Sequence, residues 1–439
     1  MDVLDPPQAA LSDERLLAFA ERQARPLLLG IPADGDDRVP VPVEATGPDV
    51  PLPPGLHRML DSAPYPRGRV DSDVPVRTRV LGTIAAAAPQ RFEVRSAVNP
   101  HRAYPAAHCF YSAQLFLLTA GGAWHYDASG HLLRPVAGDA ELDRELDGPA
   151  SLAVVCHLGS VPTRYRELRW SLSLCEAGHL LELLAQVGSA HRLAVRTRRD
   201  LPDAALLDRL GLRARDGWTP AGAVELDAPG EGGARPPAAG PDTGMSWAQV
   251  LFERSAGRAN KGFSPAPVPL AATAAEALLA AIGRAADGVP SAAESGVDVV
   301  LASRDVEGLD PGCHLIEDGR ARRRIAGPDM DALQRSFAYP ATQMSIAGCP
   351  AALLMITDHA AAVREGGERG LRLLQLRLGA IAQAAGMALT PHGGFLRPAR
   401  SFDPDPLAAA LRLEPTRLPA YVAPLGVNRF TDLLLDVRR

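Results

Sequence analysis

Apolar residues recur along the chain in two arrangements, short continuous runs and longer stripes with helical spacing. The runs at residues 115–118 and 152–156 are short and unbroken, which predicts strands buried inside a sheet. The stripes at residues 167–187 and 367–387 are longer and have the helical period, which predicts two long helices. The sequence therefore predicts a protein that mixes strands with helices. Further elements are expected at residues 123–126, 270–287, 297–301 and 352–357.

Two segments interrupt this order. Residues 1–75 hold one amphipathic stretch, expected to be a helix at 13–30, and then an arm rich in Pro, Asp and Gly. Residues 221–245 are rich in Gly, Pro and Ala, a composition typical of flexible linkers. These interruptions predict a first domain at 76–220 and a second domain at 246–439.

The two domains have matching internal spacing. In each of them a short apolar run precedes a long helix, and a Leu-x-Leu sequence follows that helix. Glu167 to Leu212 spans 45 positions, and Glu368 to Leu413 spans the same 45. An offset of about 200 residues indicates a duplicated domain, which in one chain would imitate a homodimer. The alternative is that two unrelated modules of similar size happen to share this spacing.

Charge and cysteine content narrow the class of protein. The net charge of the 439-residue chain is −5 and its pI is about 6.1, so no basic footprint for nucleic acid is present. The five cysteines are far apart and form no zinc-binding spacing, which favours reduced thiols and no metal site. The N-terminus is acidic, and no apolar run reaches the ~20 residues that span a bilayer. We therefore expect a cytoplasmic protein with no membrane partner.

One short cluster carries candidate chemistry. Arg254, Ser255 and Arg258 place two guanidiniums and a hydroxyl within five residues, ahead of a helical stretch. A guanidinium offers a rigid fork of donors that matches a phosphate group, and a hydroxyl adds one more hydrogen bond. The cluster therefore suggests a phosphate site. The alternative is a solvated surface cluster, which is the commoner fate of such short motifs.

Several further motifs accompany this cluster in a fixed order. They are Ser96-Ala97-Val98-Asn99-Pro100, Trp124-His125-Tyr126-Asp127, Glu176-Ala177-Gly178-His179, Val306-Glu307-Gly308-Leu309-Asp310-Pro311-Gly312 and Pro391-His392-Gly393-Gly394-Phe395. With the arginine cluster they resemble the nitroreductase superfamily and, within it, the flavin-dependent dehydrogenases that oxidise azolines in ribosomally made peptides. The resemblance covers most of the chain from about residue 76 onward. It implies an α+β fold of two nitroreductase-like domains fused as an intrachain pseudo-dimer.

The resemblance also implies FMN as the cofactor, bound between the two domains. Arg254 and Arg258 would hold the FMN phosphate, supported by Ser255. Arg429 lies where the family often places a further basic phosphate ligand. The alternative for Arg429 is an ordinary surface charge.

Other positions would face the remainder of the FMN molecule. Ser96 and Asn99 would bond to its ring or ribityl chain, although Asn99 replaces a family glycine and can instead cap a turn. Gly393 and Gly394 would allow the backbone to approach the flavin closely, or simply form a helix-to-strand turn.

The two domains differ in how well they keep these motifs. The first domain has only the poor basic run at 75–79 in place of the arginine cluster. The second has the degraded segment at 290–295 in place of residues 96–105. We therefore expect one FMN per chain.

The resemblance points to Arg164 and Tyr165 as the catalytic pair. The azoline dehydrogenases carry a Lys-Tyr pair shortly before the central helix, and Arg164 stands here in place of the lysine. Because an arginine does not deprotonate, Arg164 cannot act as the base, but it can lower the pKa of Tyr165 or hold substrate. The identity of the general base is therefore not assigned. The alternative for Tyr165 is that it is an ordinary packing residue.

The resemblance thus implies an FMN-dependent dehydrogenase that oxidises thiazolines or oxazolines to thiazoles or oxazoles in a peptide natural product. Its partners would be the precursor peptide and a cyclodehydratase. One alternative is an NAD(P)H-dependent, nitroreductase-like oxidoreductase acting on small molecules. The other is a degenerate, non-catalytic scaffold that binds the peptide or a partner protein.

Overall fold

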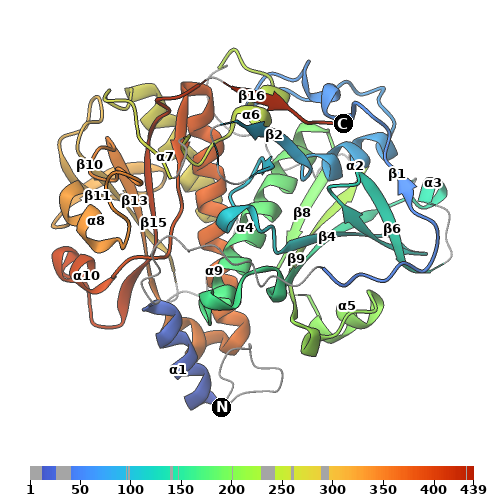
Figure 1. Cartoon of the computed structure of the whole chain (residues 1–439), viewed down its shortest axis with the longest axis horizontal. Coiled ribbons are helices and arrows are strands. Elements are labelled where there is room, and N and C mark those ends of the chain that lie inside the picture. The colour runs from blue at the N-terminus through green and yellow to red at the C-terminus, as the bar shows by residue number, and fades with distance from the viewer. Residues whose placement is uncertain are drawn as a thin grey trace.

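Two sheets stand on either side of a pair of long central helices, α4 (Leu168–Ala190) and α9 (His359–Leu389), as Figure 1 shows. The protein is represented by a computed structural model. It describes residues 12–25, 41–94, 96, 99–138, 142–146, 148–199, 201–228, 243–258, 262–287, 296–431 and 433–439.

The first sheet has seven strands in the order β1-β6-β5-β4-β7-β9-β8, with antiparallel neighbours. Its strands are β1 (Val50–Pro51), β4 (Ala113–Leu118), β5 (Ala123–Asp127), β6 (Leu132–Ala137), β7 (Ala150–His157), β8 (Ala194–Arg198) and β9 (Trp218–Asp227). The central strand β7 is apolar along nearly its whole length because α4 covers one face of it and α5 lies on the other side of the sheet.

The second sheet repeats this topology without the added edge strand, in the order β12-β11-β10-β13-β15-β14. Its strands are β10 (Asp298–Ser303), β11 (Gly312–Glu317), β12 (Arg320–Ile325), β13 (Ala351–Asp358), β14 (Gly394–Leu396) and β15 (Arg417–Val427). Strands β7 and β13 start at residues 150 and 351, 201 positions apart. The irregularities in their pairing, at Val154/Val155 and Met355/Ile356, are separated by the same 201 positions. The duplication expected from the sequence is therefore present in the structure.

The remaining elements surround these two sheets. The helices are α1 (Asp13–Ala24), α2 (Val76–Ala85), α3 (Leu142–Glu145), α5 (Asp203–Arg209), α6 (Trp247–Glu253), α7 (Ala272–Asp287), α8 (Met330–Ser336) and α10 (Asp405–Leu411). Short 3-10 turns are η1 (Leu56–Leu60), η2 (Ala107–Cys109), η3 (Leu158–Ser160), η4 (Thr163–Tyr165), η5 (Ala214–Asp216) and η6 (Thr390–His392).

The central helices cross where each has a glycine. A Cβ on Gly178 would lie 2.2 Å from the carbonyl oxygen of Leu376, and a Cβ on Gly379 would lie 2.0 Å from that of Cys175. The two contacts are equivalent because both pairs are related by the shift of 201 positions. Such reciprocal contacts are typical of a two-fold interface, here formed within one chain.

The two halves also exchange terminal segments. The last strand, β16 (Leu434–Asp436), joins β2 (Pro89–Glu93) and β3 (His101–Arg102) in a small sheet. At the other end, α1 packs on the lower part of α9 and on the start of α4 (Figure 1). Because each terminus lies against the opposite half, the halves are fastened together outside the central helix pair as well.

The structure confirms the expected strands and helices and corrects three boundaries. The helix expected at 13–30 ends at Ala24, and residues 26–40 lie outside the described residues. The first seven residues of the expected linker, 221–227, belong to β9, and 229–242 lie outside the described part. The Gly and Ala content there indicated a linker, but the segment pairs with β7 and β8 inside the sheet.

The third correction concerns the long helix expected at 367–387. It lies within α9, which begins at His359 and has a non-helical residue at Gly367 (φ 59°, ψ −142°). The same break occurs at Arg166 (φ 48°, ψ −133°), just before α4. Gly367 and Arg166 are 201 positions apart, so both halves turn into the central helix in the same way.

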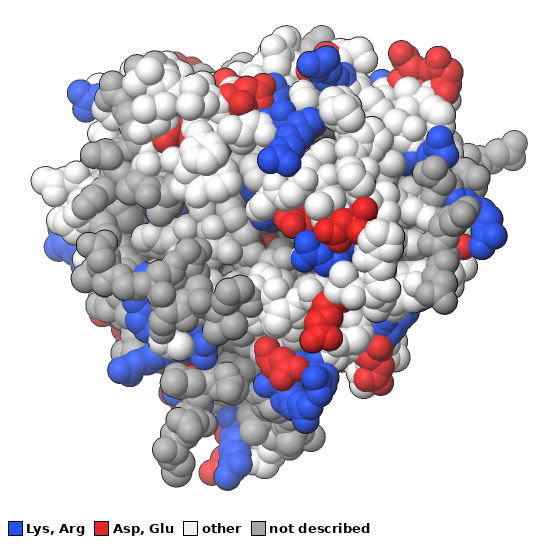
Figure 2. Space-filling view, turned by 45° about the vertical axis from the view of Figure 1, so that its right-hand side comes forward, with Lys and Arg blue, Asp and Glu red and all other residues white. Residues whose placement is uncertain are grey.

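The described helices contain none that is both long and apolar enough to cross a membrane. On the face drawn in Figure 2, acidic and basic side chains of the described residues lie next to one another, with no broad area of one sign among them.

Candidate functional site

The arginine cluster follows α6 directly and is buried. Ser246 begins this helix with a capping box, in which its side chain accepts from the Gln249 N–H and the Gln249 side chain accepts from the Ser246 N–H. The helix ends at Glu253, and the side chains of Arg254, Ser255 and Arg258 are 4%, 1% and 7% exposed. The alternative of a solvated surface cluster is therefore wrong.

Arg254 is buried, and no carboxylate of the described residues is hydrogen-bonded to it. Within the described residues its guanidinium has no hydrogen-bond acceptor, and burial lowers its pKa to about 10, with the nearby Arg91 acting in the same direction. Burying a cation without an acceptor is costly. This environment is the one expected of a group that binds an anion.

Residues from both halves meet at this cluster. Arg258 donates to the carbonyl and the carboxylate of Glu253, at 3.0 and 2.7 Å, and its Nε lies 3.8 Å from Oε1 of Glu93 in the first half. Glu93 is also bound by Arg91, whose Nε donates to Oε1 at 3.0 Å. Burial alone would raise the pKa of Glu93, but Arg91, His101 and Arg258 together hold it below its ordinary value.

The loop after β2 carries two of the expected residues. Asn99 receives the N–H of Glu93 at 2.9 Å and donates to the carbonyls of Glu93 and Ser96, at 3.0 and 3.3 Å. Both amide donors of Asn99 thus close the loop, which is the turn-capping role named as the alternative. Ser96 lies half-buried within the same loop. A direct contact of either residue with a cofactor stays a prediction.

Gly393 and Gly394 form the turn between η6 and β14. Gly393 has a left-handed conformation (φ 67°), and a Cβ on Gly394 would lie 2.9 Å from the carbonyl oxygen of Leu389. The chain therefore needs both glycines for the turn itself. The turn nevertheless leads to the cluster, because the N–H of Leu396 donates to the carbonyl of Ser255 at 3.4 Å.

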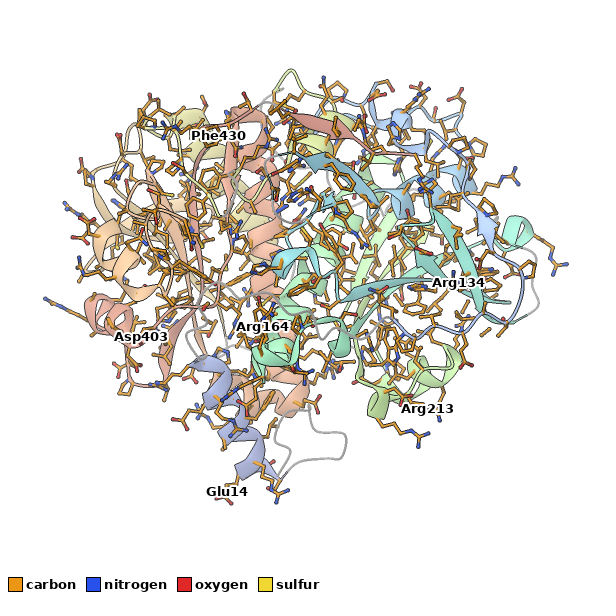
Figure 3. All side chains as sticks on the ribbon, in the orientation of Figure 1. Glu14, Arg134, Arg164, Arg213, Asp403 and Phe430 are labelled. Carbon is orange, nitrogen blue, oxygen red and sulfur yellow. The ribbon has the colours of Figure 1, made fainter. Side chains whose placement is uncertain are left out.

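Arg429 is exposed, with its guanidinium 5.8 Å from the ring centre of Phe430. In Figure 3, Phe430 lies at the edge of the second half, whereas Arg164 lies near the boundary between the two halves. The structure gives Arg429 the surroundings of a surface charge. Its role as a phosphate ligand stays a prediction.

Tyr165 belongs to η4 and is buried against the edge of Phe110, with ring centres 5.9 Å apart. The guanidinium of Arg164 lies 5.5 Å from the centre of the Tyr165 ring. Arg164 does act to lower the pKa of Tyr165, as expected, but its effect is outweighed. Burial raises that pKa to about 12, helped by Tyr339 and opposed by Arg164. Desolvation of the phenolate outweighs one nearby cation.

The segment at 107–111, which contacts Tyr165 through Phe110, was not among the predicted site residues. His108, Cys109 and Tyr111 all have left-handed backbone conformations (φ 45°, 56° and 50°), which are rare outside glycine and common at functional sites. The ring of His108 stacks on Phe110, with centres 5.7 Å apart. Burial lowers the pKa of His108 to about 4, with Arg397 and Arg164 acting in the same direction. No spacing in the sequence signalled these conformations.

The first half lacks the counterpart of the arginine cluster. There η1 precedes α2 as α6 precedes α7, and η1 is followed by Asp61 and Ser62 in place of Arg254 and Ser255. The poor basic run at 75–79, expected in place of the arginine cluster, forms the start of α2 and does not follow η1 as the cluster follows α6. The degraded segment at 290–295 lies outside the described residues.

Comparison with solved structures identifies the fold. The chain superimposes on a candidate nitroreductase of Anabaena variabilis with a TM-score of 0.72 and 14% identity, over 94% of this chain and 99% of that one. The protein thus has an α+β, nitroreductase-like fold. No protein-family profile matches the chain, and no curated protein sequence matches it.

Two other structures match about half of the chain. One is a candidate nitroreductase of Ralstonia eutropha, with 18% identity over 47% of this chain and 98% of that one, at a TM-score of 0.30. The other is the E. coli microcin synthetase McbBCD complex with truncated pro-MccB17 bound, with 16% identity over 50% of this chain and 95% of that one, also at 0.30.

Proposed function

We propose that the protein is an FMN-dependent oxidoreductase with a single cofactor site between its halves. The observation that carries the proposal is the buried guanidinium of Arg254, which has no acceptor among the described residues. A nitroreductase-like fold provides the context, because flavin chemistry is what the resemblance in the sequence implies.

The residues present fit an FMN phosphate. This group is a dianion with several acceptor oxygens, and Arg254 offers all of its donors while Arg258 keeps its Nε–H unbonded. Ser255 accepts from Gly257 at 3.0 Å and retains its own hydroxyl hydrogen for donation. When bound, FMN would supply the hydride-accepting chemistry. In the first half, η1 is followed by the carboxylate of Asp61 and not by a guanidinium.

The finer proposal is that the substrate is a thiazoline or oxazoline in a ribosomally made peptide, and that a precursor peptide and a cyclodehydratase are the partners. In this reaction Tyr165 would face the substrate. With a pKa of about 12 its phenol keeps its proton at neutral pH, so Oη would donate a hydrogen bond rather than remove a proton. Arg164 would hold an electron-rich group of the substrate beside that ring.

The visible spectrum and a flavin titration test the cofactor site. We expect about one equivalent of FMN per chain and an Arg254→Gln variant whose dissociation constant for FMN is about 10- to 100-fold higher, the cost of one charge-assisted contact. Asp61→Asn is the matched control and should leave FMN binding unchanged. A colourless protein that takes up no added FMN would instead identify the non-catalytic scaffold.

One observation favours the second candidate, an NAD(P)H-dependent reductase of small molecules. Tyr165, with a pKa of about 12, is no base near neutrality, and an arginine does not deprotonate. Azoline oxidation needs such a base, whereas simple flavin reduction does not. Rapid bleaching of the bound flavin by NADPH would support this candidate. Turnover of an azoline peptide with slow bleaching would support the dehydrogenase.

A further inference from the structure

Strand β2 is inverted with respect to the usual pattern of a surface strand. It buries two charged side chains, Arg91 at 1% and Glu93 at 6% exposure, and it exposes Phe92 at 41%. Val94, directly after the strand, is 56% exposed. An ordinary surface strand buries its apolar face and exposes its polar face. Departures from this pattern of buried apolar and exposed polar side chains occur mainly at functional sites. We therefore expect the charged, inward-facing side chains of β2 to have a function.

The neighbouring strand keeps β2 in this orientation. Leu435 of β16 pairs with Phe92, and the N–H of Val94 donates to the carbonyl of Leu433 at 3.0 Å. Leu433 and Leu435 are 50% and 58% exposed, so the outward face of both strands is apolar. The C-terminal segment of the chain therefore holds the charged face of β2 toward the arginine cluster.

Arg91 contacts the end of α6, next to the cluster. Its Nη1 donates to the carbonyl of Phe252 in the last turn of α6, two residues before Arg254. Its Nε and Nη2 donate to Glu93. Of the five N–H groups of a guanidinium, two thus have no partner among the described residues. Arg91 also influences Arg254 electrostatically as a like charge.

A purely structural role accounts poorly for this arrangement. Arg91 and Arg258 pair with the buried Glu93 and the partly exposed Glu253, whereas Arg254 has no ion pair among the described residues. The three guanidiniums thus outnumber the two carboxylates, which leaves an excess positive charge. A buried ion pair by itself contributes little net stability, and a third buried cation is unfavourable until an anion joins it. The excess positive charge and the unbonded donors are both explained by a bound phosphate.

We propose that Arg91 is a third phosphate-binding residue, contributed by the first half, and that Glu93 orients it. The proposal rests on the proposed FMN site and extends it, because the sequence motif alone supplies phosphate ligands from the second half only. The phosphate would then be held by guanidiniums from both halves, which would couple cofactor binding to their association.

Riboflavin provides the test, because it has the rings and ribityl chain of FMN but no phosphate. Dissociation constants of both flavins are measured on the full-length apoprotein by quenching of flavin fluorescence. In an Arg91→Gln variant we expect the constant for FMN to rise about 10- to 100-fold and that for riboflavin to stay unchanged. Arg91→Lys, which keeps the charge but loses the fork, should give a smaller rise.

Arg79→Gln is the matched control. Arg79 is also buried, at 5% exposure, and among the described residues its side chain donates only to the carbonyls of Ser72 and Val74. Its loss should change both flavin constants equally or not at all. If Arg91→Gln weakens FMN and riboflavin by the same factor, Arg91 merely holds the end of α6 and the inference is wrong, while the cofactor site stands.

Two further outcomes are decisive. If the wild-type protein binds FMN no more tightly than riboflavin, the phosphate site itself is absent and the proposed function fails with it. If Arg91→Gln does not fold, the Arg91→Lys variant decides through competition by inorganic phosphate. Phosphate should displace FMN less effectively from that variant than from the wild type, and equal displacement would contradict the role of Arg91.

Discussion

In the second half α6 is followed by Arg254 and Ser255, whereas in the first half η1 is followed by Asp61 and Ser62. The sheets of the two halves nevertheless share one strand order and the same irregularity in the central pairing. The comparison teaches that packing and ligand binding place separate demands on the chain. The strand order tolerates substitutions that preserve apolar volume. A phosphate site, by contrast, is lost when an aspartate stands in place of a single arginine.

The halves also differ in their buried histidines, which leads to the largest expected effect. Burial lowers the pKa of one such residue in the second half, His359, to about 3. In the first half, burial or half-burial lowers the pKa of several histidines to about 3 to 4, namely His101, His108, His125, His157, His179 and His191. A folded-state pKa below the ordinary 6.5 means that the folded protein favours the neutral imidazole. The folded state is therefore fully stable above pH 6.5 and loses stability as the pH falls from 6.5 toward the folded-state pKa.

At pH 5 each histidine with a folded pKa of about 3 should cost about 2 kcal/mol of the free energy of unfolding. We therefore expect a steep fall in stability between pH 7.5 and pH 5, measured by urea unfolding with tryptophan fluorescence. His191→Gln should reduce this pH dependence, because the His191 ring is fully buried and hydrogen-bonded to Thr83 at 3.0 Å. Equal stability of the wild type at both pH values would contradict the assignment.

The glycine contact between the central helices should show how alike the halves are. Gly178→Ala and Gly379→Ala each place a Cβ within 2.2 Å of a backbone oxygen of the other helix, so each should cost about 2–4 kcal/mol. Gly366→Ala is the control, because a Cβ there meets nothing within 4 Å. Thermal unfolding measures all three. A large cost for only one of the first two variants would show that the interface is not symmetric.

The smallest expected effect concerns the break before each central helix. Arg166 adopts a conformation that its counterpart Gly367 adopts without strain. Arg166→Gly should therefore stabilise the protein or leave it unchanged, by at most about 1 kcal/mol, whereas Gly367→Ala should destabilise it by about 1–2 kcal/mol. Calorimetry on the two variants checks this difference in sign. Loss of stability in Arg166→Gly would mean that the arginine side chain makes a compensating contact.

Local pattern carried much of the sequence analysis. The strands β4, β7 and β13 and the helices α4 and α7 were predictable because each buries a continuous or periodic apolar face. The duplication was predictable because equal spacing survives in a single chain. The predicted start of the linker at residue 221 was wrong because it lies within β9. The Gly and Ala residues there are typical of a linker, but they pack between strands inside the sheet.

The sequence by itself determined the elements, the two-fold repeat and the arginine cluster, since these depend on residues close together along the chain. Only the tertiary structure decided which groups surround that cluster. Arg91 and Glu93 reach it because β16 pairs with β2 across more than 300 positions of sequence, and no local pattern records such a contact. The raised pKa of Tyr165 was likewise set by burial, which only the assembled fold defines.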